Sequence, residues 1–417
     1  MTIIGNRLIL SVLTLLFAST AIYLVPAGYP QPGHVAALVL LIPLLASLRT
    51  IKLGRPEWLL LAFWFYVCFV NGVHWFYHQD VSFVLSTAYW TYGLVLFFSL
   101  RQLTINLSTL WLAPLGSLLL MLPVLLTLSF FGGERFYGDG RFLGTFTDPN
   151  QMSYWLICMF VASLLSVKKP NWFGPASAFG IFVIIFGLIF LASSRGAMLA
   201  GLVLLAGLIW WALEFSNNKQ RSEYKGAPAV CDHPPDTAVA SLGRLPFAKV
   251  LLIFFLVLIV IMSVMYITYL LSDAVQIITN DLIRRTQKTS LLWQIEARGY
   301  LRLIEFPQFL IFGAGQGFDS RFMEPIDGTV IYEVHSSLIA PLFYYGVIGF
   351  GLLYSAFYLL ARDRLVGWQW LVFIAPFVYG LFTYGLRTPI FWIMLASLYS
   401  INPRSDSCTT STKRKGP

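Results

Sequence analysis

Charged residues are scarce in this sequence. Only 11% of its 417 residues are Asp, Glu, Lys or Arg, whereas 58% are hydrophobic, and the mean hydropathy is +0.73. About a quarter of the residues of a soluble globular protein are charged, so this chain cannot cover a water-exposed surface. The scarcity excludes a soluble enzyme and a disordered chain, and the many apolar runs exclude a single membrane anchor. The sequence therefore predicts a polytopic membrane protein.

Cysteine is also scarce, and its four residues show no CxxC spacing, so we expect neither a disulfide framework nor a metal site. The cysteines are Cys68, Cys158, Cys231 and Cys408. A repeat of 20 to 50 residues is missing, which argues against a solenoid.

The glycine-rich run 313–317 lacks the context of a dinucleotide-binding loop, so we expect no nucleotide cofactor. Its glycines would still let the backbone approach a ligand or another helix closely.

Apolar runs are abundant instead. A run of about 16 to 22 apolar residues can cross a hydrocarbon core about 30 Å thick as a helix, so we predict an all-α protein with about twelve transmembrane helices. The second and the last run are short, which fits tilted helices. The predicted spans are 8–25, 35–48, 58–73, 81–100, 110–131, 152–167, 176–192, 197–215, 250–271, 336–360, 367–386 and 389–401.

The net charge of +9 has a sided distribution. Most Lys and Arg residues lie in alternate loops between the spans, and the positive-inside rule then places both termini in the cytoplasm. This distribution also argues against nucleic-acid binding, because the basic residues serve insertion rather than a phosphate-binding patch. Membrane lipids are the expected surroundings. The loops on the other side of the membrane then face outward.

The chain divides into four parts. Residues 1–271 hold spans one to nine with a cytoplasmic linker, rich in Pro and Ala, at 216–249. A large external segment, 272–335, lies between spans nine and ten, and 336–401 hold spans ten to twelve. Residues 402–417 form a cytoplasmic tail. The external segment mixes arginines with aromatic and aliphatic residues, so we expect it to fold on the membrane surface through short amphipathic helices.

Positive charge on the external face opposes the insertion bias and needs a local reason. Arg298 and Arg302 are four residues apart and would share one face of a helix. Two guanidinium groups on one face suit a diphosphate, because each presents a planar fork of donors. The alternative is that Glu296 or Glu305 pairs with them on a solvated face.

Arg195 lies between two apolar runs with few polar neighbours. An arginine so near the membrane is costly unless it reaches the lipid phosphates, pairs, or lines a wet cavity. It is either a turn arginine that contacts lipid phosphates or a third cation that faces a bound phosphate.

His335 stands where the external segment re-enters the membrane. Histidine is the side chain most easily placed to accept a proton near neutral pH, although a single interfacial histidine can be structural. His74 and His78 are spaced for metal binding, but an aromatic belt explains them better.

The loop 132–153 contains a turn and helix-start signal at Asp148-Pro149-Asn150. Its polar residues Arg141, Asp148 and Asn150 could also recognise sugar hydroxyls. Turn chemistry is the simpler explanation for Pro149 and Asn150.

The order of these motifs resembles that of the O-antigen ligase and Wzy-type polysaccharide polymerase superfamily. The resemblance covers about residues 132 to 360 and includes the layout of twelve spans with a late external segment. Individual motifs are weak, but their order and sidedness together are more specific. The motifs are Gly144 to Asn150, Ser194-Arg195-Gly196, Arg298 with Pro307 to Phe318, His335-Ser336, and Gly346 with Gly349.

The resemblance implies a GT-C-like glycosyltransferase of the bacterial inner membrane, with its active site at the periplasmic face and without a metal or cofactor. Its donor would be a glycan on undecaprenyl diphosphate, and its acceptor either lipid A-core, for a ligase, or another lipid-linked glycan, for a polymerase. Arg195 and Arg298 match the family's diphosphate-binding arginines, and His335 matches the histidine that activates the acceptor hydroxyl. Arg302 is added from its helical spacing, and the short distance from Arg298 to Gly313 would let the two arginines exchange roles.

Two other classes remain open from the sequence. A polytopic transporter or flippase would carry ionisable residues near the middle of the membrane, whereas nearly all charges here lie at predicted span ends. A non-catalytic scaffold of an export complex is the other alternative.

Overall fold

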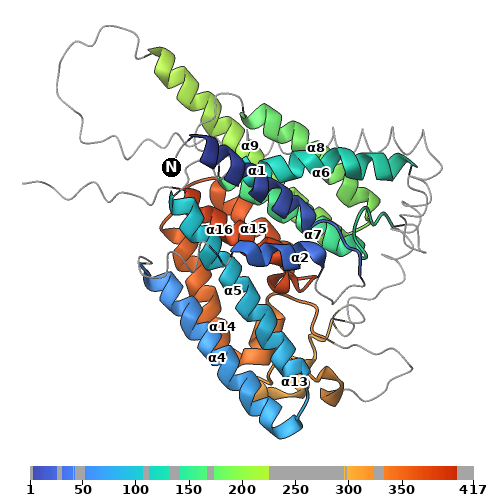
Figure 1. The fold of residues 1–417 in the computed structure, drawn as a ribbon. Coiled ribbons are helices and arrows are strands. Elements are labelled where there is room, and N and C mark those ends of the chain that lie inside the picture. Colours follow the sequence, from blue (N-terminus) through green and yellow to red (C-terminus); the bar gives the residue numbers. More distant parts are fainter. Residues whose placement is uncertain are drawn as a thin grey trace, which may run out of the picture.

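The computed structural model describes residues 3–25, 31–40, 42, 52–106, 112–131, 141–166, 173–224, 295, 298–322 and 333–401. Every regular element in these residues is a helix (Figure 1). The α-helices are α1 (Ile3–Ser19), α2 (Pro32–Ala36), α4 (Arg55–His78), α5 (Ser82–Asn106), α6 (Leu112–Phe131), α7 (Pro149–Leu165), α8 (Pro175–Leu191), α9 (Arg195–Tyr224), α13 (Arg302–Glu305), α14 (Ile339–Arg362), α15 (Gln369–Gly380) and α16 (Pro389–Ser397). Short 3-10 helices are η1 (Ala37–Leu40), η4 (Pro307–Phe309), η5 (Asp319–Phe322), η6 (Gly385–Arg387) and η7 (Leu398–Ser400).

Five helices of the described chain, α4, α5, α6, α9 and α14, are long and apolar enough to cross a membrane. The all-helical membrane fold expected from the sequence is consistent with this finding. Four further apolar helices are shorter, and the count of twelve spans stays a prediction. The predicted ninth span, the linker beyond residue 224 and the tail lie outside the described residues, as does half of the second span.

Helix α7 forms the centre of the fold. It begins at Pro149 after Asp148, whose carboxylate accepts a hydrogen bond from the amide of Asn150 and caps the helix. Every residue of α7 from Met152 to Leu165 is buried, because α6, α8, α9, α15 and α16 all pack against it. The helix start predicted from the Asp-Pro-Asn sequence is therefore confirmed.

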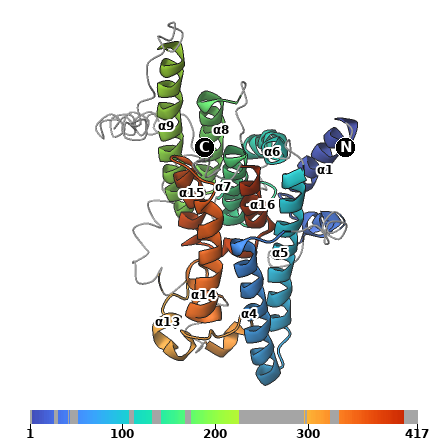
Figure 2. The ribbon, with the colours of Figure 1, turned by 90° about the vertical axis from the view of Figure 1, so that its left-hand side faces the viewer.

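Helices α4, α5 and α14 lie side by side in both views (Figures 1 and 2). Helix α16 packs against α5 on one side and α7 on the other, and so joins this group to the central helices. Large apolar side chains of α4, among them Phe65, Phe69 and Phe76, are exposed on the outside of the group. Exposed aromatic residues on a long apolar helix are expected where lipid is the surroundings.

Polar residues gather at opposite ends of these helices. At one end, Arg101 forms a buried ion pair of 2.9 Å with Glu57, Tyr399 donates to the same carboxylate, and the Arg364 guanidinium lies 4.0 Å from the Tyr399 ring centre. All four residues belong to ends predicted to face the cytoplasm. The external segment meets the other ends of α4 and α14, where His74 lies against the Gly313 carbonyl and Phe343 accepts from Ala314. The orientation of the two ends in the membrane stays a prediction.

Helix α15 ends at Gly380, earlier than the predicted span end at residue 386. The backbone leaves the helix there, because the amide of Ser337 donates to the carbonyls of Gly380 and Thr383, and Ser337 Oγ accepts from the amide of Gly385 at 2.9 Å. An irregular segment, 381–388, therefore lies within what the hydropathy alone makes continuous. Phe382, which contacts the candidate site, belongs to this segment.

Helix α14 is kinked at Gly346, whose φ of 62° and ψ of −173° suit only glycine. The kink frees backbone groups that the external segment pairs: Ala314 and Gly315 donate their amides to the carbonyls of Phe343 and Tyr344 at 3.0 and 2.9 Å. A Cβ at Gly346 would overlap the carbonyl of Ile311. The close backbone approach expected of the glycine-rich run is confirmed.

We predict that Gly346→Ala lowers the free energy of unfolding by about 3 kcal/mol, since it adds both a disallowed backbone conformation and an overlap. Gly351→Ala, in the same helix, is the matched control: nothing lies within 4 Å of its added Cβ, so this change is expected to be neutral or stabilising. The thermal midpoint of the purified protein in detergent measures both. Equal midpoints for the two variants would contradict the role of the kink.

Candidate functional site

The start of α9 carries the first candidate residue. Arg195 is the first residue of this 30-residue helix, and its side chain is half-buried. The first amide groups of a helix lack backbone partners, and the helix dipole makes this end positive. The preceding turn, in which Ser193 has a φ of 48°, directs the chain into α9. The local potential around Arg195 therefore favours an anion.

Arg298 is brought to the same place by Phe382. A Cβ on Gly196 would lie 2.7 Å from the Phe382 side chain, so the glycine of the Ser-Arg-Gly sequence lets the start of α9 pack against Phe382. The Phe382 carbonyl accepts a hydrogen bond from Arg298 Nη1, and the guanidinium carbon lies 5.4 Å from the ring centre. Gly196 thus explains how Arg195 and Arg298 come close.

The charges of the two arginines interact. Burial lowers the pKa of Arg298, and the nearby charge of Arg195 lowers it further. Among the described residues, Arg298 has a carbonyl and an aromatic ring as partners and no carboxylate within ion-pair distance. Two neighbouring cations repel each other unless an anion lies between them, so this pair is suited to binding one.

His335 adjoins Arg298 directly, because its amide donates to the Arg298 carbonyl at 3.2 Å. The side chain is exposed, but the surrounding protein restricts its hydration and lowers its pKa below the usual 6.5. The charges of Arg298 and Arg387 lower this pKa further, and Asp148 opposes them. The imidazole is therefore neutral at pH 7 and able to accept a proton.

Asn150 ties three elements of the site together. Its Oδ1 accepts from Ser194 Oγ at 3.0 Å, and its backbone carbonyl accepts from the Tyr379 hydroxyl at 3.0 Å. These bonds fix the start of α7 to the turn before α9 and to α15. Asp148 caps α7, and its charge reaches His335. Tyr379 was not recognised from the sequence, because its partners are far away along the chain.

Arg141 lies at the edge of this region. The amide of the next residue, Phe142, donates to the carbonyl of Leu191 at the end of α8 at 3.0 Å. The Arg141 side chain is half-buried, and its role in sugar binding stays a prediction.

Arg302 has a different environment. Its side chain is 6% exposed and forms an ion pair of 2.7 Å with Asp319, which also accepts from the Tyr344 hydroxyl at 2.7 Å. The single helical face expected for Arg298 and Arg302 is not formed, because α13 begins at Arg302 and Arg298 lies in the preceding turn. The partner is Asp319 rather than the exposed Glu305, and Glu296 lies outside the described residues.

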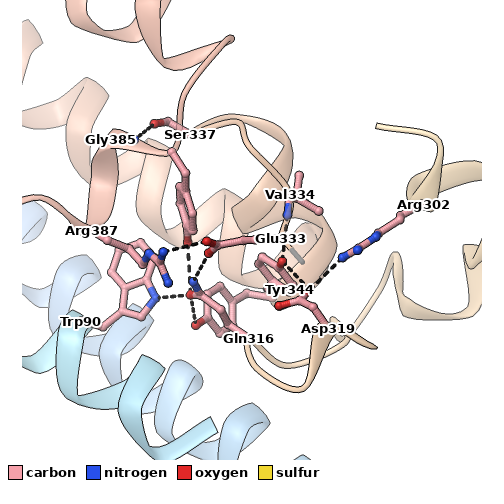
Figure 3. Close-up of polar contacts among 12 residues, drawn as sticks. Trp90, Arg302, Gln316, Asp319, Glu333, Val334, Ser337, Tyr344, Gly385 and Arg387 are labelled. Carbon is pink, nitrogen blue, oxygen red and sulfur yellow. Dashed lines mark hydrogen bonds and ion pairs between the residues drawn. The ribbon is translucent and has the colours of Figure 1, made fainter. Parts of the chain in front are cut away.

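A second polar cluster lies beside Arg302 (Figure 3). Glu333 pairs with Arg387 at 2.7 Å and accepts from Gln316 Nε2 at 3.3 Å. The Gln316 side-chain oxygen accepts from Trp90 Nε1 and from the hydroxyls of Tyr345 and Tyr384 at 2.9 to 3.1 Å. The sequence pattern pointed to neither Gln316 nor Glu333. The position of Glu333 two residues before His335 was the available signal.

The structure thus brings together Arg195, Arg298, Asp148, Asn150 and His335 from separate parts of the chain, and it places Arg302 in a buried ion pair beside them. In the described residues, no group of three His, Cys, Asp or Glu side chains could hold a metal ion. A scan against models of known protein families finds no match, and a search of curated proteins finds no relative. The resemblance of the motifs stays a prediction.

Arg302→Met should lower the free energy of unfolding by about 3 kcal/mol, because it leaves Asp319, whose side chain is 13% exposed, without its cation. Arg298→Met, in the same segment, should change stability little, because its guanidinium pairs with a carbonyl and a ring rather than a carboxylate. Denaturation in detergent measures both variants. Adding Asp319→Asn to Arg302→Met should recover part of the loss, and no recovery would argue against the ion pair as its cause.

Proposed function

We propose that this protein is a metal-independent, inverting glycosyltransferase of the O-antigen polymerase or ligase type. Its donor is a glycan on undecaprenyl diphosphate, taken up at the periplasmic face of the inner membrane. The observation that carries the proposal is the convergence of two arginines and a histidine. The start of α9 at Arg195 packs against Phe382, the Phe382 carbonyl accepts from Arg298, and the Arg298 carbonyl accepts from the amide of His335. The GT-C-like fold with twelve spans is part of the same proposal.

The arginines would act on the leaving group. When the bond between the anomeric carbon and the diphosphate breaks, negative charge builds on the diphosphate oxygens. Arg195, Arg298 and the positive end of α9 bind that charge more tightly as it develops, which lowers the barrier. The absence of a carboxylate partner for Arg298 in the described residues supports this role, whereas the ion pair of Arg302 favours a structural one.

His335 would act on the acceptor. Its neutral imidazole accepts the proton of the incoming sugar hydroxyl while the hydroxyl oxygen bonds to the anomeric carbon. Attack from the side opposite the diphosphate inverts that carbon. Asp148 stabilises the imidazolium that forms, because it is the carboxylate whose charge acts on His335.

His335→Ala should lower the rate of glycan transfer by about 10²- to 10⁴-fold, the usual contribution of a general base. The assay is purified protein in lipid nanodiscs with a lipid-linked oligosaccharide donor, and size-exclusion chromatography controls for folding. Growth of the lipid-linked glycan would identify a polymerase, and transfer to lipid A-core a ligase. Undiminished transfer by folded His335→Ala protein would remove this assignment.

The pH profile gives a more specific prediction. The rate should fall as the pH decreases through the pKa of His335, which lies below 6.5, because the protonated imidazole cannot act as a base. Asp148→Asn retains a side-chain cap for α7 but removes a charge that raises this pKa. The acidic limb of the profile should therefore move to lower pH in this variant. A shift to higher pH, or none, would contradict the placement of Asp148 beside His335.

A further inference from the structure

A cavity of about 360 Å³ lies at the start of α5, beside the polar cluster of Figure 3. This volume falls within the range of about 300 to 1,000 Å³ that is usual for ligand pockets. Its walls come from the α4–α5 turn, α5, the glycine-rich run, η5 and the residues next to His335. The polar residues that line it are Asp80, Ser82, Ser86, Gln316, Asp319, Ser320, Glu333 and Arg387.

The charges of the cavity differ from those of the arginine pair. Three carboxylates and one guanidinium line it, and the carboxylates of Asp319 and Glu333 are paired with Arg302 and Arg387. Arg387, the cation in the lining, is thus matched by a carboxylate, so the lining offers a diphosphate no cation of the kind that Arg298 provides. The groups supply acceptors and donors suited to hydroxyls, which are neutral and can both donate and accept. The arginine pair is therefore suited to an anion, and the neighbouring cavity to hydroxyl groups.

The walls are held rigidly. Gln316 is 1% exposed and is fixed by Trp90, Tyr345 and Tyr384 on its oxygen and by Glu333 on its nitrogen. A side chain whose rotamer is already fixed loses little entropy when a ligand binds. The polar lining is therefore prepared for a ligand rather than assembled by it.

Phe318 adds an apolar wall. Its φ of 50° is unusual for a bulky residue, and its amide donates to Ser82 Oγ at 2.6 Å, which fixes the turn. Strained backbone of this kind persists where the surroundings hold it, and it is common at ligand sites. A ring beside carboxylates and an amide suits a sugar, which has an apolar C–H face and polar edges.

We propose that this cavity binds a sugar unit of the acceptor glycan. The inference rests on the proposed function, and it adds the place and chemistry of the acceptor. His335 connects the two places: its amide bonds to Arg298, and it follows Glu333 by two residues. A sugar seated against Glu333 and Arg387 would present the next hydroxyl to the imidazole, with the donor diphosphate on the arginines.

The test is binding of two probes to the full-length protein in detergent. One probe is the free oligosaccharide released by mild acid from the surface polysaccharide of the native cells, and the other is inorganic pyrophosphate. Ser320→Trp places a large ring in the cavity from an exposed position, and Glu333→Gln removes a lining charge. Gln308→Trp is the matched control, because Gln308 is exposed on the same segment but does not line the cavity.

Glu333→Gln should weaken oligosaccharide binding by about tenfold or more, the effect of losing a hydrogen bond to a charged group. Ser320→Trp should weaken it by about tenfold or more as well, because the added ring occupies the space of the sugar. Pyrophosphate binding should be unchanged in Ser320→Trp and weakened in Arg298→Met. Oligosaccharide binding that Arg298→Met weakens and Ser320→Trp does not would overturn the acceptor site. Binding that depends on the cavity in a protein without transfer activity would leave the sugar site standing and refute the proposed function instead.

Discussion

The backbone contact between the glycine-rich run and the kink of α14 is the constraint on which the candidate site depends. Ala314 and Gly315 donate to carbonyls that a straight helix would use internally. These carbonyls are free because α14 is kinked at Gly346, in a backbone conformation that suits only a residue without a side chain. Unpaired backbone groups are costly in a membrane, so kink and run stabilise each other. This contact fixes the residues around Gln316 and Asp319 to α14, which itself begins just after His335.

Arginines beside this contact fall into two kinds, and their partners distinguish them. Arg302 and Arg387 are matched by Asp319 and Glu333, and such pairs hold segments together because either charge alone would be strongly destabilising. Arg298 is matched by a carbonyl and a ring, which position its guanidinium without neutralising it. The charge of Arg195 acts on this cation, and an anion bound beside both guanidinium groups would relieve their repulsion.

Local signals in the sequence were sufficient where the cause is local. The start of α7 follows from a capping carboxylate, a proline and an asparagine in succession, and the long apolar helices follow from composition. The end of α15 at Gly380 could not be predicted, because the bonds that stop it come from Ser337, more than forty residues earlier. The residues after Gly380 are apolar enough that hydropathy predicts a continuation of the span through them.

The separate roles of Arg298 and Arg302 show that prediction from the sequence has the same limit in the candidate site. Their spacing of four residues suggested one helical face, but spacing has a meaning only within a helix that continues, and α13 starts at the second arginine. The residue that separates their roles is Asp319, which pairs with Arg302 although it lies 17 residues further along the chain. Sequence reasoning could find the cationic residues, since charge is conspicuous in an apolar chain. It could not rank them, because whether a cation is neutralised depends on a carboxylate that only the fold brings near.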